Sequence, residues 1–348
     1  MILKTLWYYL FKILIKCSLF FYTKRILVKG KENIPKKGAI LFVVNHPNGL
    51  IDPLIVAVNN PRVQHFLVRA ASFKKPLIKR FLESLNLMPI YRMRDGVKQL
   101  GNNKDVFDKC FTLLNNQKAL MIFPEGSHDK RRTVRTLSKG FSRIVFGALE
   151  QNPALQIHII PVGLTYQNPS VYPSNVCLHY GSPILANDFY KPLIINSEIK
   201  RLKDVITSQL KTLCVHIPID ENYEKTLAKL TAANVDFTEV ELVNSMITSS
   251  IISGREKKLN LVGFLKPFII LNSIIPWIIW KYTKSKIDEF EFIDTFRYGI
   301  GTITVSVNLM IQTYLASFFY QWILGLVYLA SSLLLLLLYS KFQPITVK

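Results

Sequence analysis

Short apolar runs alternate with longer amphipathic stretches through the first two thirds of this 348-residue chain. Runs rich in Val, Ile, Leu and Phe that are bounded by turn-forming residues predict buried strands. The expected strands cover residues 25–28, 39–44, 65–70, 87–91, 119–123, 156–161 and 176–180. Helices are expected from residues 52–53 onward and over 74–85, 95–115, 138–149 and 197–213. Strands that alternate with helices predict an α/β fold with a mixed, largely parallel sheet flanked by helices.

The first 23 residues are almost wholly apolar and aromatic, interrupted by Lys4, Lys12 and Lys16. At about 100° per residue these three lysines share one face of a helix. The pattern favours an amphipathic helix that lies in a membrane interface. A spanning helix is an alternative of sufficient length, at the cost of burying lysines. A signal peptide is disfavoured because no small-residue cleavage site follows.

The longest apolar run lies near the C-terminus. Residues 299–339 form a stretch of 41 positions without a charge, too long for one membrane span and suited to two. We expect the turn between the two spans near Tyr320 and Gln321, and Trp322 and Tyr339 are placed as interface anchors.

Residues 263–280 are also apolar, but they contain Lys266, Pro267 and Pro276 and carry basic residues on both flanks. Positive charge on both sides argues against a simple crossing. The pattern favours a proline-broken re-entrant or surface segment, with a spanning segment as the alternative.

These patterns predict four regions. Residues 1–24 are the membrane-associating helix, 25–215 a catalytic α/β domain, 216–260 a helical extension or linker, and 261–348 a membrane region. The third region is helical with mixed charge over 221–230 and 237–251 and carries no site signal.

Composition favours a lipid partner. The formal net charge is +21, which calls for a polyanion such as nucleic acid, anionic lipid or a phosphorylated substrate. Hydrophobic residues make up 49% of the chain, and many basic residues flank apolar runs instead of alternating with aromatics as a nucleic-acid surface would. The four cysteines form no CxxC pair and no zinc spacing, so we expect buried or lipid-facing thiols and no metal.

A histidine and an aspartate follow the apolar run that ends at Val44. Asn45 and His46 come first, then a Pro-Asn-Gly turn, and Asp52 lies six residues beyond the histidine. Sites in α/β folds gather at the carboxyl ends of strands. If the turn brings Asp52 to the imidazole, His46 becomes a general base oriented by a carboxylate. The alternatives are a structural histidine and an aspartate that only caps the next helix.

A second turn follows the expected strand 119–123. Gly126 allows close backbone approach, and Glu125 is suited either to accepting hydrogen bonds from substrate hydroxyls or to fixing the loop. The basic residues that follow, from Lys130 to Arg135, have the pattern of a solvated charge run. Lys139 and Arg143 differ, because they lie four apart on a helix that Ser138 is able to cap, and such a pair can hold a phosphate.

The expected strand 87–91 is followed by Arg92 and Arg94, two residues apart and therefore on one side of an extended chain. Guanidinium groups suit bidentate phosphate binding. Surface arginines are common, so this signal is weak by itself.

Together these stretches resemble the PlsC-like family of glycerol-3-phosphate and 1-acylglycerol-3-phosphate acyltransferases, over roughly residues 25–215. The family carries four blocks in order, and the chain has a counterpart of each. They are Asn45 to Asp52, the strand Pro89 to Arg92, the sequence FPEGS at Phe123 to Ser127, and the apolar strand Ile159 to Val162 that contains Pro161.

Two features depart from the common family pattern. Five residues separate His46 from Asp52 where the family usually has four, which resembles a His-Pro-Asn subgroup. The second block has Asn86 and Pro89 where the family often has Gly and Phe.

The resemblance implies acyl transfer from acyl-CoA or acyl-carrier protein, as co-substrate, to a glycerol-phosphate-type hydroxyl in phospholipid synthesis. It implies His46 as general base with Asp52 as its partner, and no cofactor. Seven further residues are predicted to bind the acceptor or its phosphate, and three more are predicted to support the site. The binding residues are Arg92, Arg94, Glu125, Gly126, Ser127, Lys139 and Arg143; the supporting residues are Asn45, Pro124 and Pro161. We expect a membrane protein with its catalytic domain on the cytoplasmic side. The alternatives are another lipid acceptor and a non-catalytic lipid-binding scaffold.

Overall fold

The computed structural model describes residues 2–91, 101, 103–256, 259–287, 289 and 292–345. Its centre is a sheet with the strand order β1-β7-β6-β2-β5-β3-β4, and β8 pairs with β6. The strands are β1 (Arg25–Lys29), β2 (Ala39–Val44), β3 (Gln64–Arg69), β4 (Leu87–Ile90), β5 (Ala119–Ile122), β6 (Ile157–Tyr166), β7 (Asn175–Tyr180) and β8 (Ile184–Leu185). All seven expected strands occur, and β8 was not expected.

Most of the pairing is parallel, as the sequence predicts. Strand β2 lies parallel to both β5 and β6, and β3 lies parallel to β4 and β5. Strands β7 and β8 run antiparallel to β6, and β1 runs parallel to β7. The predicted mixed, largely parallel sheet is therefore confirmed. The ends of β2 and β5 lie side by side at one edge, which places the two motif loops next to each other.

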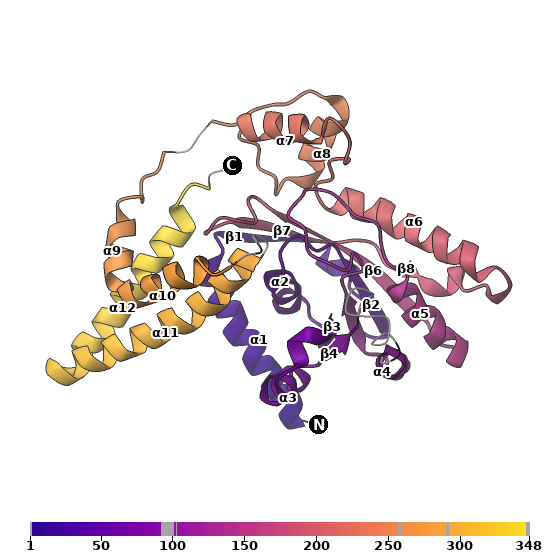
Figure 1. Ribbon diagram of the computed structural model, residues 1–348, viewed down its shortest axis with the longest axis horizontal. Coiled ribbons are helices and arrows are strands. Elements are labelled where there is room, and N and C mark those ends of the chain that lie inside the picture. Colours follow the sequence, from indigo (N-terminus) through magenta and orange to yellow (C-terminus); the bar gives the residue numbers. More distant parts are fainter. Residues whose placement is uncertain are drawn as a thin grey trace.

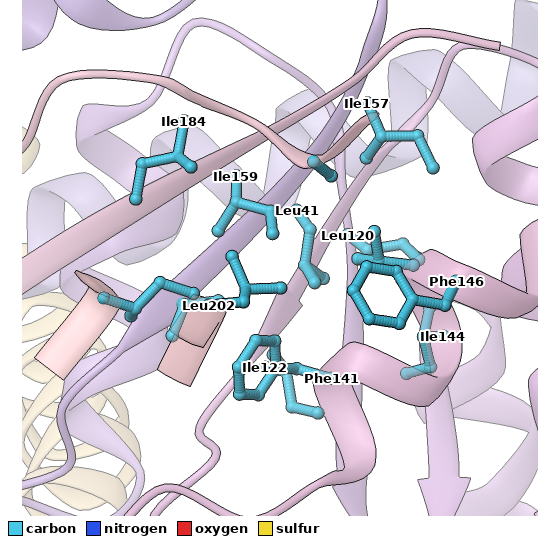
Figure 2. Packing of buried hydrophobic residues seen from close by; sticks show 14 of the residues in the cluster. Leu41, Leu120, Ile122, Phe141, Ile144, Phe146, Ile157, Ile159, Ile184 and Leu202 are labelled. Carbon is cyan, nitrogen blue, oxygen red and sulfur yellow. The ribbon is translucent and has the colours of Figure 1, made fainter. Parts of the chain in front are cut away.

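Strand β2 is buried along its whole length and separates two cores. Its side chains alternate between the two faces of the sheet, as strand geometry requires. Leu41 and Val43 pack in one core with helices α4 (Asn103–Asn115), α5 (Gly140–Gln151) and α6 (Ile195–Leu213). Figure 2 shows Leu41 and Leu120 from the strands among Phe141 and Ile144 of α5.

The opposite face packs on helix α2 (Ile51–Asn59) and helix α1 (Ile2–Tyr22). Phe42 and Val44 contribute from the strand, and Ile55 contributes from α2. Helix α3 (Pro76–Ser84) follows β3 and ends just before β4. Figure 1 shows α1, α2 and α3 grouped apart from α5 and α6.

Two local expectations were wrong. Helix α5 begins at Gly140 with Lys139 as its N-cap and has no side-chain cap, so Ser138 does not cap it. Strand β6 continues through Pro161 to Tyr166 instead of ending at residue 161. Pro161 is tolerated inside the strand because it lies where the neighbour of β6 changes: β8 pairs with residues 158–159, and β7 pairs from Val162 onward.

The helices expected between residues 216 and 260 pack against β7 of the sheet. Helices α7 (Tyr223–Ala232) and α8 (Val240–Ser249) share a core with Cys177 of β7. The Arg132 guanidinium stacks 3.6 Å from the Phe237 ring and donates to the carbonyls of Tyr166 and Gln167. Burial lowers the pKa of Arg132 to about 10. The prediction of a solvated charge run is therefore wrong at Arg132, which joins Phe237 to β6.

The face of helix α1 that carries its lysines packs toward the rest of the protein around Lys12, the middle one of the three. Lys12 lies between the buried Tyr8 and Leu19 and donates to the Asn60 carbonyl at 2.5 Å. The opposite side exposes apolar residues, namely Leu3, Leu6, Leu10, Ile13 and Leu14. The amphipathic pattern therefore has the orientation that leaves its apolar side uncovered, and the membrane-interface role remains a prediction.

The C-terminal part forms two long helices, α11 (Ile293–Phe319) and α12 (Trp322–Phe342), with the expected break at Tyr320 and Gln321. By length and composition alone, these are the two helices in the described residues that are able to cross a membrane. Figure 1 shows them as a pair extending away from the sheet, with α9 (Leu265–Asn272) and α10 (Ile274–Lys284) beside them.

Residues 263–280 are divided into the short helices α9 and α10. Pro267 and Pro276 each lie in the first turn of their helix, where a missing backbone N–H costs little. Helices of 8 and 11 residues are each shorter than the roughly 20 residues that a membrane crossing requires.

The core around β2 generates a stability prediction. Leu41 is 0% exposed, so Leu41→Ala creates a cavity and is expected to lower the free energy of unfolding by about 2–5 kcal/mol. Leu77→Ala on α3 is the matched control, because Leu77 is 81% exposed. Denaturant unfolding in detergent, followed by tryptophan fluorescence, measures both; equal stability of the two variants would contradict the packing described.

Candidate active site

The two loops that carry the polar motifs lie beside each other at the carboxyl ends of β2 and β5. The residue pairing of β2 with β5 ends at Val43 and Ile122, so the chain leaves both strands at the same level. The His46 main-chain N–H points to Glu125 Oε2 at 3.3 Å, and the His46 carbonyl accepts from the Asp129 main chain at 3.0 Å. The loops therefore form one unit.

His46 and Asp52 meet within this unit. His46 Nδ1 lies 2.8 Å from Asp52 Oδ2. The Asp52 side chain is 0% exposed and that of His46 is 16% exposed. Helix α2 has Leu50 as N-cap and no side-chain cap, so the alternative in which Asp52 only caps the helix does not describe the structure. The Pro-Asn-Gly turn folds the chain back so that a six-residue spacing becomes a direct contact.

Two further donors hold the Asp52 carboxylate. The Asn48 main-chain N–H donates to Oδ2 at 2.7 Å, and the Tyr166 hydroxyl donates to Oδ1 at 2.6 Å. Burial raises the pKa of Asp52 well above its ordinary value, while these two hydrogen bonds act in the opposite direction and the charge of Asp294 raises it further. A buried carboxylate needs such partners to be tolerated.

The contact also fixes the chemistry available to the imidazole. A carboxylate is an acceptor, so Nδ1 carries the proton in this pair and Nε2 is the nitrogen with the lone pair of the neutral ring. The ring stacks on Phe123 with centroids 4.2 Å apart and meets His128 edge-on at 5.7 Å. Such an oriented imidazole is suited to removing a proton from a hydroxyl at the loop surface.

Glu125 is engaged in fixing the FPEGS loop. Its Oε2 accepts from Arg135 Nη2 at 2.7 Å and from Arg135 Nε at 3.1 Å, and its Oε1 accepts from the Arg135 main chain at 3.2 Å. Of the two roles that the sequence allows for Glu125, the structure has the loop-fixing one, and binding of an acceptor remains a prediction.

Ser127 belongs to the same network. Arg135 Nη1 donates to Ser127 Oγ at 2.7 Å, and Arg135 also donates to the Ser127 carbonyl. Gly126 adopts a φ of 75°, which favours glycine, and the space that a Cβ would occupy is open. The prediction that Arg135 belongs to a solvated charge run is therefore wrong, because Arg135 binds both Glu125 and Ser127 within this loop.

The supporting residues act through the backbone. Asn45 bridges β2 and β6, since its Oδ1 accepts from Leu164 N at 2.7 Å and its Nδ2 donates to Leu164 O at 3.0 Å. The Pro124 carbonyl accepts from Ser138 N at 2.8 Å, which brings the start of α5 to the loop. The Pro161 carbonyl accepts from Gly181 N at 2.8 Å.

The four cations predicted to bind phosphate divide into two pairs. Arg92 and Arg94 lie outside the described residues. Lys139 and Arg143 are both exposed on the start of α5, and neither forms an ion pair among the described residues. Within the same residues, no group of three or more His, Cys, Asp or Glu side chains is arranged to hold a metal ion.

The structure adds residues that the motifs do not reveal. Tyr166 lies at the end of β6, where a buried tyrosine among apolar neighbours gives no signal of a partner. A hollow of about 20 Å³ lies against the loop and is lined by Asn45, Pro47 and Lys130 among others. This volume suits roughly one water molecule, so the hollow is too small for a lipid substrate.

Comparisons with known proteins agree with the motifs. The family model described as "Acyltransferase" matches residues 25–165. The chain is 26% identical over 115 residues to "Glycerol-3-phosphate O-acyltransferase 1" of Saccharomyces cerevisiae, which covers 32% of this chain and 15% of that protein. It is 25% identical over 167 residues to "1-acyl-sn-glycerol-3-phosphate acyltransferase" of Borreliella burgdorferi, which covers 48% of this chain and 61% of that protein.

Among solved structures, the PlsC lysophosphatidic acid acyltransferase of Thermotoga maritima aligns with a TM-score of 0.38 at 17% identity and covers 54% of this chain and 73% of that one. The matched stretch is thus a small part of the yeast relative and under two thirds of the Borreliella one.

The donors around Asp52 generate a prediction on ionisation. Tyr166→Phe removes a hydrogen bond that stabilises the charged carboxylate, so the pKa of Asp52 is expected to rise further. At a pH just below that pKa, less of Asp52 is ionised in the variant than in the wild type. Titration by ¹³C NMR of labelled aspartate carboxyls, with the Asp52 signal assigned through Asp52→Asn, measures the shift.

Tyr180→Phe is the matched control for this titration. Tyr180 is also buried, and its hydroxyl bonds to the Val56 carbonyl instead of a carboxylate. An unchanged Asp52 titration in Tyr166→Phe, or equal shifts in both variants, would contradict the assigned contact.

Proposed function

Because this chain belongs to the PlsC-like acyltransferase family, we propose that it transfers a fatty acyl group from an acyl thioester to a hydroxyl of a glycerol-phosphate-type acceptor. The observation that carries the proposal is the 2.8 Å contact between His46 Nδ1 and Asp52 Oδ2, formed next to the FPEGS loop. The relatives named above as glycerol-phosphate acyltransferases support the substrate class.

In the proposed reaction, His46 Nε2 removes the proton of the acceptor hydroxyl as its oxygen attacks the thioester carbonyl. A C–O ester bond forms, the C–S bond breaks, and the imidazolium returns its proton to the departing thiolate. Asp52 stabilises the imidazolium and holds its orientation. The donor is acyl-CoA or acyl-carrier protein, the acceptor is glycerol 3-phosphate or its 1-acyl form, and no covalent enzyme intermediate is required.

Phosphate binding is assigned by the same proposal to the cations near the loops. Arg92 and Arg94 follow β4 in the sequence. Lys139 is the N-cap residue of α5, at the end of the helix where its dipole favours an anion, and Arg143 lies one turn further along the helix. Together they supply positive charge around an anionic acceptor.

We also propose that the protein works at a membrane with the catalytic domain on the cytoplasmic side. The uncovered apolar side of α1, the exposed Leu77 and Phe81 of α3, and the two long C-terminal helices support work at a membrane; the cytoplasmic side is part of the proposal alone. Apolar faces of this kind bury into the headgroup and acyl boundary. Both the acceptor lipid and the acyl chain would then reach His46 from the bilayer surface.

The general-base role generates a prediction on activity. His46→Ala is expected to lower acyl transfer by about 10²–10⁴-fold, because a positioned general base contributes that much. His46→Asn is expected to fall similarly, since its amide can still donate toward Asp52 but carries no base. A panel of acyl-CoA and acyl-carrier-protein donors with glycerol 3-phosphate and its 1-acyl form, using protein in membranes, measures the loss.

His65→Asn is the matched control for this panel. His65 lies on β3 and faces the Ala119 carbonyl at 3.4 Å, apart from the dyad. It is expected to keep wild-type activity. Activity of both His46 variants within a few-fold of the wild type would reject the mechanism, and an inactive wild type across the whole panel would reject the reaction.

The membrane placement generates a topology prediction. The end of α12 returns to the catalytic domain, where Lys341 Nζ donates to the Thr23 carbonyl and Lys24 Nζ donates to the Gln343 carbonyl, at 2.8 Å and 2.7 Å. Two crossings therefore leave Gln321, at the tip, on the opposite side from the sheet. Gln321→Cys, in a chain carrying Cys17→Ser, is expected to react with a membrane-impermeant maleimide from the outside of intact cells.

Leu193→Cys is the control for this labelling, because Leu193 is fully exposed on the catalytic domain. It is expected to react only in inverted vesicles. Labelling of positions 321 and 193 from the same side would contradict the two crossings.

A further inference from the structure

The first turn of helix α11 contacts the turn that carries His46 and Asp52, residues 46–52, here called the catalytic turn. More than 240 residues of sequence separate the two. Asp294 is 4% exposed, and its Oδ2 accepts from Asn48 Nδ2 at 2.7 Å. The main-chain N–H of the same Asn48 donates to Asp52 Oδ2 at 2.7 Å. One residue, Asn48, thus connects a C-terminal helix with the carboxylate of the dyad.

The position of Asp294 is itself determined by other elements. Its Oδ1 accepts from the Tyr22 hydroxyl of α1 at 2.5 Å and from Arg297 Nη1 at 3.2 Å. Arg297 Nη2 in turn donates to the Ser170 carbonyl at 3.0 Å. A buried carboxylate with three donors around it, one of them a cation, is held in place rather than free to rotate.

The orientation of the Asn48 amide follows from its surroundings. Both groups that face Nδ2, the Asp294 carboxylate and the Pro169 carbonyl at 3.4 Å, are acceptors, so the nitrogen has to point toward them. The buried Asn48 Oδ1 has no partner among the described residues. The unpaired oxygen carries a desolvation cost, while the nitrogen holds the Asp294 carboxylate.

A second contact joins the same helix to the turn. Leu50 N donates to Thr295 Oγ1 at 3.1 Å. A Cβ at Gly49 would lie 2.6 Å from Thr295 Oγ1, so a larger residue there would require the Thr295 hydroxyl to move. The ring of Phe292, just before α11, packs 4.7 Å from His128, whose ring meets that of His46.

An acidic residue in the first turn of a helix is commonly no more than a favourable charge at the helix dipole. Asp294 differs because its side chain accepts hydrogen bonds from α1 and from the catalytic turn. In addition, Thr295 reaches the same turn independently, and Phe292 packs on His128 beside it. These contacts join the dyad to a helix that lies beyond the residues matched by the acyltransferase family model.

We propose that Asp294 is a positioning residue for the His46–Asp52 dyad: through Asn48 it fixes the catalytic turn, so that the geometry of the dyad depends on the docking of α11. The proposal deepens the proposed acyl transfer and rests on it for its kinetic consequence. Asp294 does not touch the reacting atoms, and its effect passes through Asn48 to Asp52 and His46.

Steady-state kinetics of the full chain in membranes tests the proposal. Asp294→Ala is expected to lower kcat by about ten- to hundredfold, the loss typical of a hydrogen bond to a charged group, with KM for the acyl donor within about twofold of wild type. Asn48→Ala, which keeps its main-chain N–H, is expected to show a similar loss. The double variant is expected to lose little more than either single variant, because both break one link. Asp294→Asn retains one acceptor and is expected to be intermediate.

Glu198→Ala is the matched control. Glu198 is also a buried acid that pairs with an arginine three residues later, Arg201, but it lies on α6 and its other partner is Lys191. It is expected to keep the wild-type kcat. The proposal would be overturned if the loss of kcat in the double variant equalled the product of the losses in Asp294→Ala and Asn48→Ala. A loss of kcat in Glu198→Ala equal to that in Asp294→Ala would also overturn it.

A readout that does not need turnover separates this proposal from the function. In ¹⁵N-histidine-labelled protein, the Nδ1 proton of His46 bonded to a carboxylate gives a downfield NMR signal, assigned through His46→Asn. The signal is expected to weaken or move upfield in Asp294→Ala and Asn48→Ala and to stay in Glu198→Ala. If the wild type transfers no acyl group, the function fails while this signal still decides the positioning role. If Asp294→Ala does not fold, Asp294→Asn and Asn48→Ala decide it, and an unchanged signal in both would overturn it.

Discussion

The buried carboxylate of Asp52 is the constraint on which the site depends. A charge at a position with no exposed surface is stable only with donors around it, and these donors come from two parts of the chain. His46 and Asn48 are supplied by the turn itself, and Tyr166 is supplied by the far end of β6. The turn, the sheet and the dyad are therefore one structural unit, since the turn supplies both donors to Oδ2 and β6 supplies the donor to Oδ1. The same burial raises the pKa of Asp52, and the hydrogen bonds counteract it.

The topology of the sheet explains why the two motif loops cooperate. Strands β2 and β5 are neighbours although about 75 residues separate them, and both are parallel, so their loops leave at one edge. The FPEGS loop is then held from inside by Arg135, which neutralises Glu125 and also binds Ser127. Glu125 in turn accepts from the main chain of His46. Charge pairing within one loop thereby helps to place the backbone of the other.

The sequence was sufficient for features set by local pattern. The strands, the break at Tyr320–Gln321 and the closeness of His46 to Asp52 all follow from apolar runs, turn residues and a motif. It was insufficient where the outcome depends on tertiary neighbours. Arg132 and Arg135 have the pattern of solvated cations, but Arg132 stacks on Phe237, about a hundred residues later, and Arg135 pairs with Glu125 through the fold of the FPEGS loop. Ser138 is a residue type that commonly caps helices, yet its main-chain N–H donates to the Pro124 carbonyl and helix α5 begins only at Gly140. Tyr166 and Asp294 have no local signal, because their importance arises only from the partner that the fold brings to them.

The dimensions of α11 connect the proposed chemistry with the proposed membrane. The helix has 27 residues, and its first turns, through Tyr298, pack on the catalytic turn and on α1. The remaining residues 299–319 extend about 31 Å at 1.5 Å per residue, close to the roughly 30 Å of a bilayer core. Asp294 and Arg297 would be costly within hydrocarbon, but in the proposed arrangement they lie at its boundary and satisfy each other and Asn48. The segment that anchors the protein would thus also set the height of His46 at the level of the lipid headgroups, where a glycerol-phosphate hydroxyl is found.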